Sequence, residues 1–104
     1  MTAGPEPSLQ RLEATIHGRV QGVGFRYHVC RVAASLQVSG WVANQRDGSV
    51  AVVAEGSPDS LDRLEAVLRE GPDGARVDRI EGRRVGGEGR FDGFRARSGS
   101  HAGD

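Results

Sequence analysis

The stretch HGRVQGVGFR, residues His17–Arg26, decides the fold because it separates a strand pattern from a helix pattern. Before it, Leu12, Ala14 and Ile16 alternate with polar residues, which is the period of a strand with one buried face. After it, apolar residues recur at helical spacing over residues 25–37. The glycines of the stretch therefore lie in a loop between a first strand and a first helix.

The middle of the chain predicts a hairpin followed by a second helix. Residues 38–44 are rich in β-branched and aromatic side chains, and the turn pair Asp47-Gly48 leads into a second apolar run at 49–55. Ser57-Pro58-Asp59 combines the capping hydroxyl, the first-turn proline and the first-turn acid that begin a helix. Gly71-Pro72 ends this helix.

The end of the chain predicts a strand over residues 75–85 and a short final strand around 93–97. The order strand, helix, strand, strand, helix, strand (βαββαβ) fits the split βαβ, ferredoxin-like class of α+β fold. We expect an antiparallel sheet with two helices on one face.

This topology predicts which residues meet. A strand–helix–strand crossover is almost always right-handed and leaves its two strands parallel, so the first two strands end at the same edge of the sheet. The second strand of the hairpin can lie between them. Arg26 and Asn44 then become neighbours.

Composition limits the chain to one small domain without a strong overall charge. The 104 residues are 37% hydrophobic, enough for one core, which we place at residues 10–97 between disordered tails at 1–9 and 98–104. The formal net charge of +0 provides no general attraction to nucleic acid or to an anionic membrane. One cysteine excludes an internal disulfide, and the sequence shows neither a leader pattern nor a membrane-spanning apolar run. We expect a monomer in the cytoplasm.

The glycine-rich loop has the residues of an anion-binding site. Gly18, Gly22 and Gly24 can adopt positive φ and turn N–H groups inward, beside the N–H groups that begin the first helix. Arg26 lies in the first helical turn, where a cation opposes the helix dipole unless an anion is bound. A tight turn beside a solvated arginine explains the same residues, so the loop alone leaves both interpretations open. Dinucleotide and Walker loops are excluded, because Tyr27 replaces the third glycine and the chain has no lysine.

Two motifs resemble the signatures of the acylphosphatase family. GRVQGVGFR at residues 18–26 resembles the first signature, and GWVANQRDGSVAVVAEG at residues 40–56 resembles the second. The likeness extends in order and spacing over residues 11–97. It departs from the family pattern after Phe94, where small and polar residues follow.

This resemblance implies a ferredoxin-like enzyme that hydrolyses the carboxyl–phosphate anhydride of acyl phosphates without a metal or a cofactor. It implies that Arg26 binds the phosphoryl group and that Asn44 positions the attacking water. The backbone cradle for phosphate falls on Gln21, Gly22, Val23, Gly24 and Phe25. Inorganic phosphate or sulfate can occupy such a cradle. The expected partner is a small acyl phosphate, with no role for nucleic acid or a membrane.

The histidines and the cysteine have simpler interpretations. His17 and His28 are expected to be ordinary surface or boundary residues, since three histidines without a clustered acidic partner make a poor metal site. Cys30 lies beside the apolar stripe of the first helix, where a buried or half-buried small hydrophobe is the commoner outcome.

Two alternatives to an enzyme are a nucleic-acid-binding protein and an anion sensor. Seven arginines between Arg76 and Arg97 indicate a solvated edge or an RNA-binding surface. We favour the solvated edge, because the chain is only 5% aromatic and residues 49–55 lack the aromatic RNA-binding signature. A non-catalytic anion sensor would keep Arg26 but would not need Asn44.

Overall fold

The computed structural model describes residues 9–98 of the chain. Its elements in chain order are β1 (Gln10–Arg19), α1 (Phe25–Leu36), β2 (Ser39–Asn44), β3 (Val50–Gly56), α2 (Pro58–Glu70), β4 (Arg76–Gly86) and β5 (Phe94–Arg97). Each predicted helix and strand is present, with boundaries close to those expected. Of the tails predicted at 1–9 and 98–104, only Leu9 and Ser98 belong to the described residues, and the rest of both tails lies outside them.

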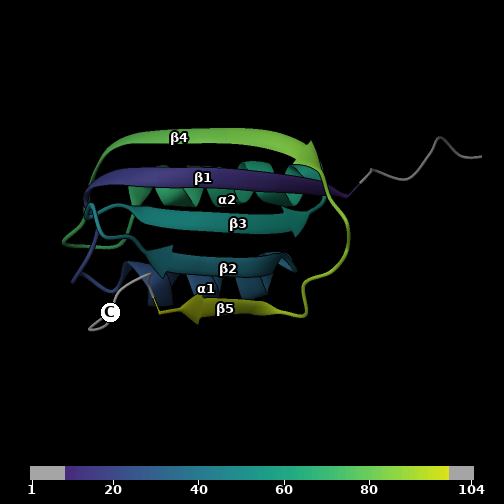
Figure 1. Cartoon of the computed structure of the whole chain (residues 1–104), viewed down its shortest axis with the longest axis horizontal. Coiled ribbons are helices and arrows are strands. Elements are labelled where there is room, and N and C mark those ends of the chain that lie inside the picture. Colours follow the sequence, from purple (N-terminus) through teal and green to yellow (C-terminus); the bar gives the residue numbers. More distant parts are fainter. Residues whose placement is uncertain (1–8, 99–104) are drawn as a thin grey trace, which may run out of the picture.

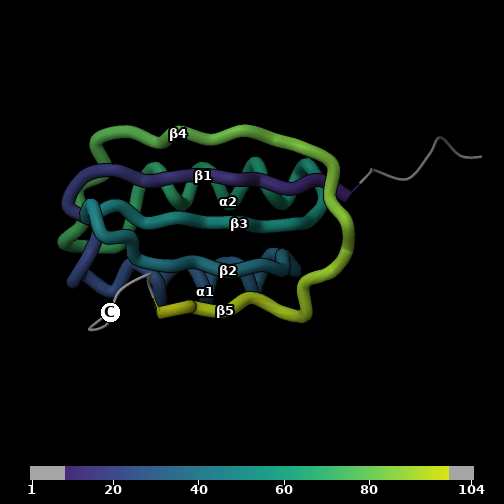
Figure 2. The backbone as a smooth tube through the Cα atoms, in the orientation of Figure 1, coloured from purple at the N-terminus to yellow at the C-terminus, as the bar shows by residue number. Residues whose placement is uncertain are grey.

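The strands form one sheet in the order β4-β1-β3-β2-β5, and both helices cover the same face of it (Figure 1). The pairs β1–β3, β1–β4 and β2–β3 are antiparallel, and β3 lies between β1 and β2 as expected. The ferredoxin-like α+β class is confirmed. The sheet as a whole is mixed, because β5 pairs with β2 in parallel, so the expected antiparallel arrangement holds only for the first four strands. The path of the chain explains this pairing: the loop after β4 crosses the end of the sheet and enters β5 in the direction of β2 (Figure 2).

A single core lies between the sheet and the helices. Leu12, Ala14 and Ile16 of β1 are each at most 6% exposed, as their alternation predicts. The buried apolar residues of the helices are Phe25, Val29, Ala33, Leu61, Leu64 and Leu68. None of the helices within residues 9–98 is long and apolar enough to cross a membrane.

One carboxylate is buried on the sheet. Glu55 of β3 is 1% exposed and accepts hydrogen bonds from Glu88 N at 3.0 Å, Gly89 N at 2.9 Å and Arg11 Nε at 2.9 Å. Burial disfavours the charged form, but these donors outweigh it and hold the pKa of Glu55 below its usual value. Glu55 therefore anchors the loop between β4 and β5 to the sheet.

Candidate active site

The loop between β1 and α1 takes a backbone shape that glycine adopts readily. Gly22 and Gly24 have φ values of 75° and 77°. A Cβ atom at either residue would meet no atom within 4 Å, so the conformation and not crowding calls for glycine. Gly18 is not part of this loop, contrary to the expectation. It lies in β1 at an irregularity in the pairing with β4, where a Cβ atom would lie 2.1 Å from Arg76 O.

No side chain caps the N-terminus of α1. Gly24 is its capping residue, and the first turn holds no acidic residue. By contrast, α2 begins with a hydrogen bond from Ser60 N to Ser57 Oγ at 3.1 Å and has Asp59 in its first turn. The first N–H groups of α1, and the positive end of its dipole, thus have no carboxylate or hydroxyl of their own first turn to interact with.

A pocket of about 400 Å³ lies at this helix N-terminus and brings the predicted catalytic residues together. Its lining includes Gly22, Gly24 and Phe25 of the predicted cradle, Arg26 in the first turn of α1, and Asn44 at the end of β2. The two strands that lead to these residues both pair antiparallel with β3, so they end at the same edge of the sheet. The predicted neighbourhood of Arg26 and Asn44 is therefore present.

Gln21 contributes a side-chain contact that sequence reasoning missed. Unlike most of the predicted cradle, Gln21 and Val23 do not line the pocket. The Gln21 side chain donates from Nε2 to Gln45 O at 2.7 Å and to Ser49 O at 2.9 Å. Both oxygens lie in the turn directly after Asn44. Gln21 thus links the glycine loop to the hairpin. The sequence feature that could have predicted this contact is the long amide side chain of Gln21 beside the glycines of the loop.

The hairpin turn is closed by its own polar groups. Asp47 Oδ1 accepts from Ser49 Oγ at 2.6 Å and from Ser49 N at 2.9 Å, and these bonds hold the pKa of Asp47 below its usual value. Gln45 N donates to Ser49 O at 2.8 Å. Asn44 is thereby followed by a turn of fixed shape.

Arg26 is connected to the last strand of the sheet. Its Nη1 donates to Arg97 O, at the end of β5, at 2.9 Å. A guanidinium has five N–H donors in a planar fork, so it can hold a carbonyl oxygen and phosphate oxygens together. The contact holds Arg26 against the edge of the sheet.

The rest of the pocket wall comes from residues not assigned to the site from sequence: Val20, Tyr27, Cys30 and Ala96. Cys30 lies one helical turn after Arg26, a spacing that could have predicted its place in the wall. Burial raises the pKa of the Cys30 thiol, and nearby Arg26 lowers it less. Burial thus disfavours the thiolate, the form in which a cysteine acts as a nucleophile.

The two described histidines do not line this pocket. His17 Nε2 lies 2.9 Å from Glu81 Oε1 on the neighbouring strand β4. Within residues 9–98, no group of three or more His, Cys, Asp and Glu side chains is placed to hold a metal ion.

Comparison with known proteins identifies the family of the chain. The sequence matches the model of the acylphosphatase family over residues 12–96. The acylphosphatase of Bordetella avium is 42% identical over 89 residues, which cover 86% of this chain and 95% of that protein. The acylphosphatase of Salinibacter ruber is 47% identical over 88 residues, covering 85% and 93%. The crystal structure of acylphosphatase from Bacillus subtilis has a TM-score of 0.82 and 31% identity over 85% of this chain and 98% of its own. On these grounds, and with the fold and pocket described above, the chain belongs to the acylphosphatase family.

Proposed function

We propose that this chain hydrolyses the mixed anhydride of acyl phosphates to a carboxylate and inorganic phosphate. The observation that carries the proposal is the meeting of Arg26, Asn44 and the uncapped N-terminus of α1 in one pocket. The pocket thus combines a cation, backbone donors and a neutral polar side chain. Membership of the acylphosphatase family supports the same reaction.

The phosphoryl group binds between the loop backbone and Arg26. In the proposal, the backbone N–H groups of the cradle donate to its oxygens; the cradle residues are Gln21, Gly22, Val23, Gly24 and Phe25. The guanidinium of Arg26 supplies the charge that the amides lack, in a fork that matches two phosphate oxygens. The bound anion also compensates for a cation in the first turn of a helix.

Asn44 orients water for attack on phosphorus. Its carbonyl oxygen can accept from water and its amide can donate, but neither group can remove a proton at neutral pH. Positioning is therefore its whole contribution. Phosphoryl transfer relies mainly on such alignment and on charge stabilisation.

The reaction needs no general acid. The leaving group is a carboxylate whose conjugate acid has a pKa of about 4, so it departs without being protonated. The water oxygen forms a bond to phosphorus while the bond from phosphorus to the carboxylate oxygen breaks, and the carboxylate keeps the electron pair. The proton of the water passes to a phosphate oxygen of the substrate.

This chemistry requires neither a metal nor a cofactor. We expect protein dialysed against EDTA to retain its rate of phosphate release, since Arg26 and the amides stabilise the charge. A fall in rate with EDTA that zinc or magnesium restores would contradict the metal-free proposal.

Release of inorganic phosphate from acetyl phosphate and benzoyl phosphate tests the activity. Phenyl phosphate is the control, because its phenolate is a much poorer leaving group than a carboxylate and should be released far more slowly. A protein that binds phosphate but releases none from either acyl phosphate would be an anion sensor.

The proposal extends to the anions that compete with substrate, to the oligomeric state and to the location of the enzyme. Inorganic phosphate or sulfate is expected to compete with substrate in the cradle. The balanced charge and the single cysteine support a monomer in the reducing cytoplasm, with no nucleic acid or membrane partner.

A further inference from the structure

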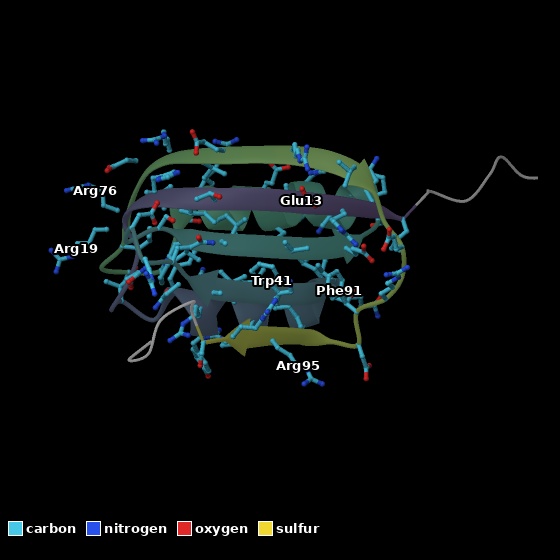
Figure 3. The ribbon with its side chains drawn as sticks, viewed as in Figure 1. Glu13, Arg19, Trp41, Arg76, Phe91 and Arg95 are labelled. Atoms are coloured by element: carbon cyan, nitrogen blue, oxygen red, sulfur yellow. The ribbon has the colours of Figure 1, made fainter. Side chains whose placement is uncertain are left out.

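The face of the sheet opposite the helices, here called the open face, carries a second pocket. It has a volume of about 310 Å³ and lies between β2, β5 and the loop that leads into β5. Its side chains comprise aromatic rings, guanidinium groups and one carboxylate, from Trp41, Phe91, Arg90, Arg95, Arg97 and Asp92. Figure 3 shows Trp41 on this face of β2, with Phe91 beside the connecting loop and Arg95 reaching past the edge of the sheet.

Trp41 and Arg97 lie together in this open-face pocket and are here called the platform. The guanidinium carbon of Arg97 lies over the Trp41 ring, 4.6 Å from its centre, a cation–π contact. Arg95 pairs directly with Trp41 in the parallel register, and Arg97 follows two residues later on the same face. The open-face pocket therefore combines an aromatic ring with the guanidinium groups of Arg95 and Arg97.

The charge of Arg95 and Arg97 is not neutralised by ion pairs of the kind found elsewhere on the open face. Arg83 pairs with Glu13 at 2.9 Å, and Arg79 lies 3.6 Å from Glu81. Within residues 9–98, no carboxylate oxygen lies within 4.0 Å of Arg95 or Arg97. Positive charge thus accumulates at the β2–β5 edge.

We propose that the open-face pocket binds a nucleoside monophosphate. A base would stack on the Trp41–Arg97 platform, as bases stack on aromatic rings and guanidinium planes in other proteins. Arg95 and Arg97 would hold the phosphate, and Asp92 would accept a hydrogen bond from a ribose hydroxyl or a base amine. The volume of about 310 Å³ suits one nucleotide. An RNA strand would continue across β3, β1 and β4, where the carboxylates of Glu13 on β1 and Glu81 on β4 lie.

The only tryptophan of the chain lies in this pocket, so its fluorescence reports binding directly. AMP is titrated against the full chain, with ribose 5-phosphate and inorganic phosphate as separate titrations at the same ionic strength. We expect saturable quenching by AMP at concentrations about ten-fold or more below those needed for ribose 5-phosphate, because stacking adds to the phosphate contacts. Equal affinities for the two would overturn the proposal, since they would reveal a simple anion site.

Substitutions separate this pocket from the candidate active site. Arg95→Gln and Arg97→Gln should each weaken AMP binding about ten-fold. The control is Arg63→Gln, which removes an exposed arginine of α2 on the opposite side of the molecule and should leave binding unchanged. Circular dichroism checks that the variants fold. An affinity for AMP that is unchanged in both Arg95→Gln and Arg97→Gln would contradict the proposal. So would a ten-nucleotide oligoadenylate that binds about a hundred-fold more tightly than AMP.

Discussion

At the scale of single residues, Arg26 carries the sharpest prediction. Arg26→Lys keeps the positive charge but loses the planar fork that matches phosphate oxygens. We expect kcat/KM for benzoyl phosphate to fall on the order of 100- to 1000-fold, the usual effect of removing one donor to transition-state charge, while the free energy of unfolding changes little. Arg63→Lys is the control for a change of the same kind far from the pocket. Near-normal turnover by Arg26→Lys would exclude a phosphate-binding role.

Asn44 should separate binding from turnover. Asn44→Ala leaves the cradle and Arg26 in place, so we expect inorganic phosphate to inhibit or bind with nearly unchanged affinity. The rate of hydrolysis should fall on the order of 100-fold, because the water is no longer aligned. The comparison needs phosphate binding by calorimetry and phosphate release on the same preparation. Equal losses of both would show that Asn44 holds the phosphate instead of the water.

At the scale of elements, a substitution can test the hydrogen bonds by which Gln21 links the glycine loop to the hairpin. Gln21→Leu removes the hydrogen bonds to Gln45 O and Ser49 O, at a cost of about 1 kcal/mol in the free energy of unfolding. The loop and Asn44 would no longer be held in register, so kcat/KM should fall about ten-fold or more.

Ser57→Ala is the matched control for Gln21→Leu. It removes the cap of α2, which follows the other end of β3, and also costs about 1 kcal/mol. Urea unfolding and phosphate release are measured on both variants. If Ser57→Ala lost as much activity as Gln21→Leu, stability and not loop position would explain the effect.

The elements themselves could be predicted because their signals are local. Alternation placed β1, and Ser57 with its neighbours placed the start of α2. The parallel pairing of β5 with β2 could not be predicted in this way. It depends on a loop held by Glu55, and no periodicity in the sequence reveals that contact.

The site was predictable to a similar extent. Motif and topology together placed Arg26 and Asn44 in one pocket. The contact from Gln21 to the hairpin, and the contribution of Ala96 to the pocket wall, depend on the packing of elements far apart in sequence. The glycine pattern also misplaced Gly18, because positive φ serves a strand irregularity as well as an anion loop.

At the scale of the whole molecule, Glu55 predicts how the fold responds to acid. Its folded pKa is lowered, so its contribution to stability is complete above the unfolded value of about 4.3 and is lost as the pH falls through the folded pKa. Glu55→Gln should cost about 2 kcal/mol at pH 7, since hydrogen bonds to a charged carboxylate are lost. Thermal unfolding of the unsubstituted protein and of Glu55→Gln is measured from pH 7 to pH 2. We expect their stabilities to converge as the pH falls. A difference that stays constant with pH would exclude the ionised carboxylate as the anchor.

The short last strand, β5, affects how the protein loses activity and begins to aggregate. β5 pairs only with β2, through four residues, yet its final carbonyl holds Arg26 and its body covers the edge of β2. Such edge elements open in local fluctuations well below the free energy of global unfolding. A molecule with β5 detached would lose the carbonyl that holds Arg26 and would expose an unpaired strand edge to other chains. Loss of activity and the first step of aggregation would then share one cause, in a molecule that is otherwise still folded.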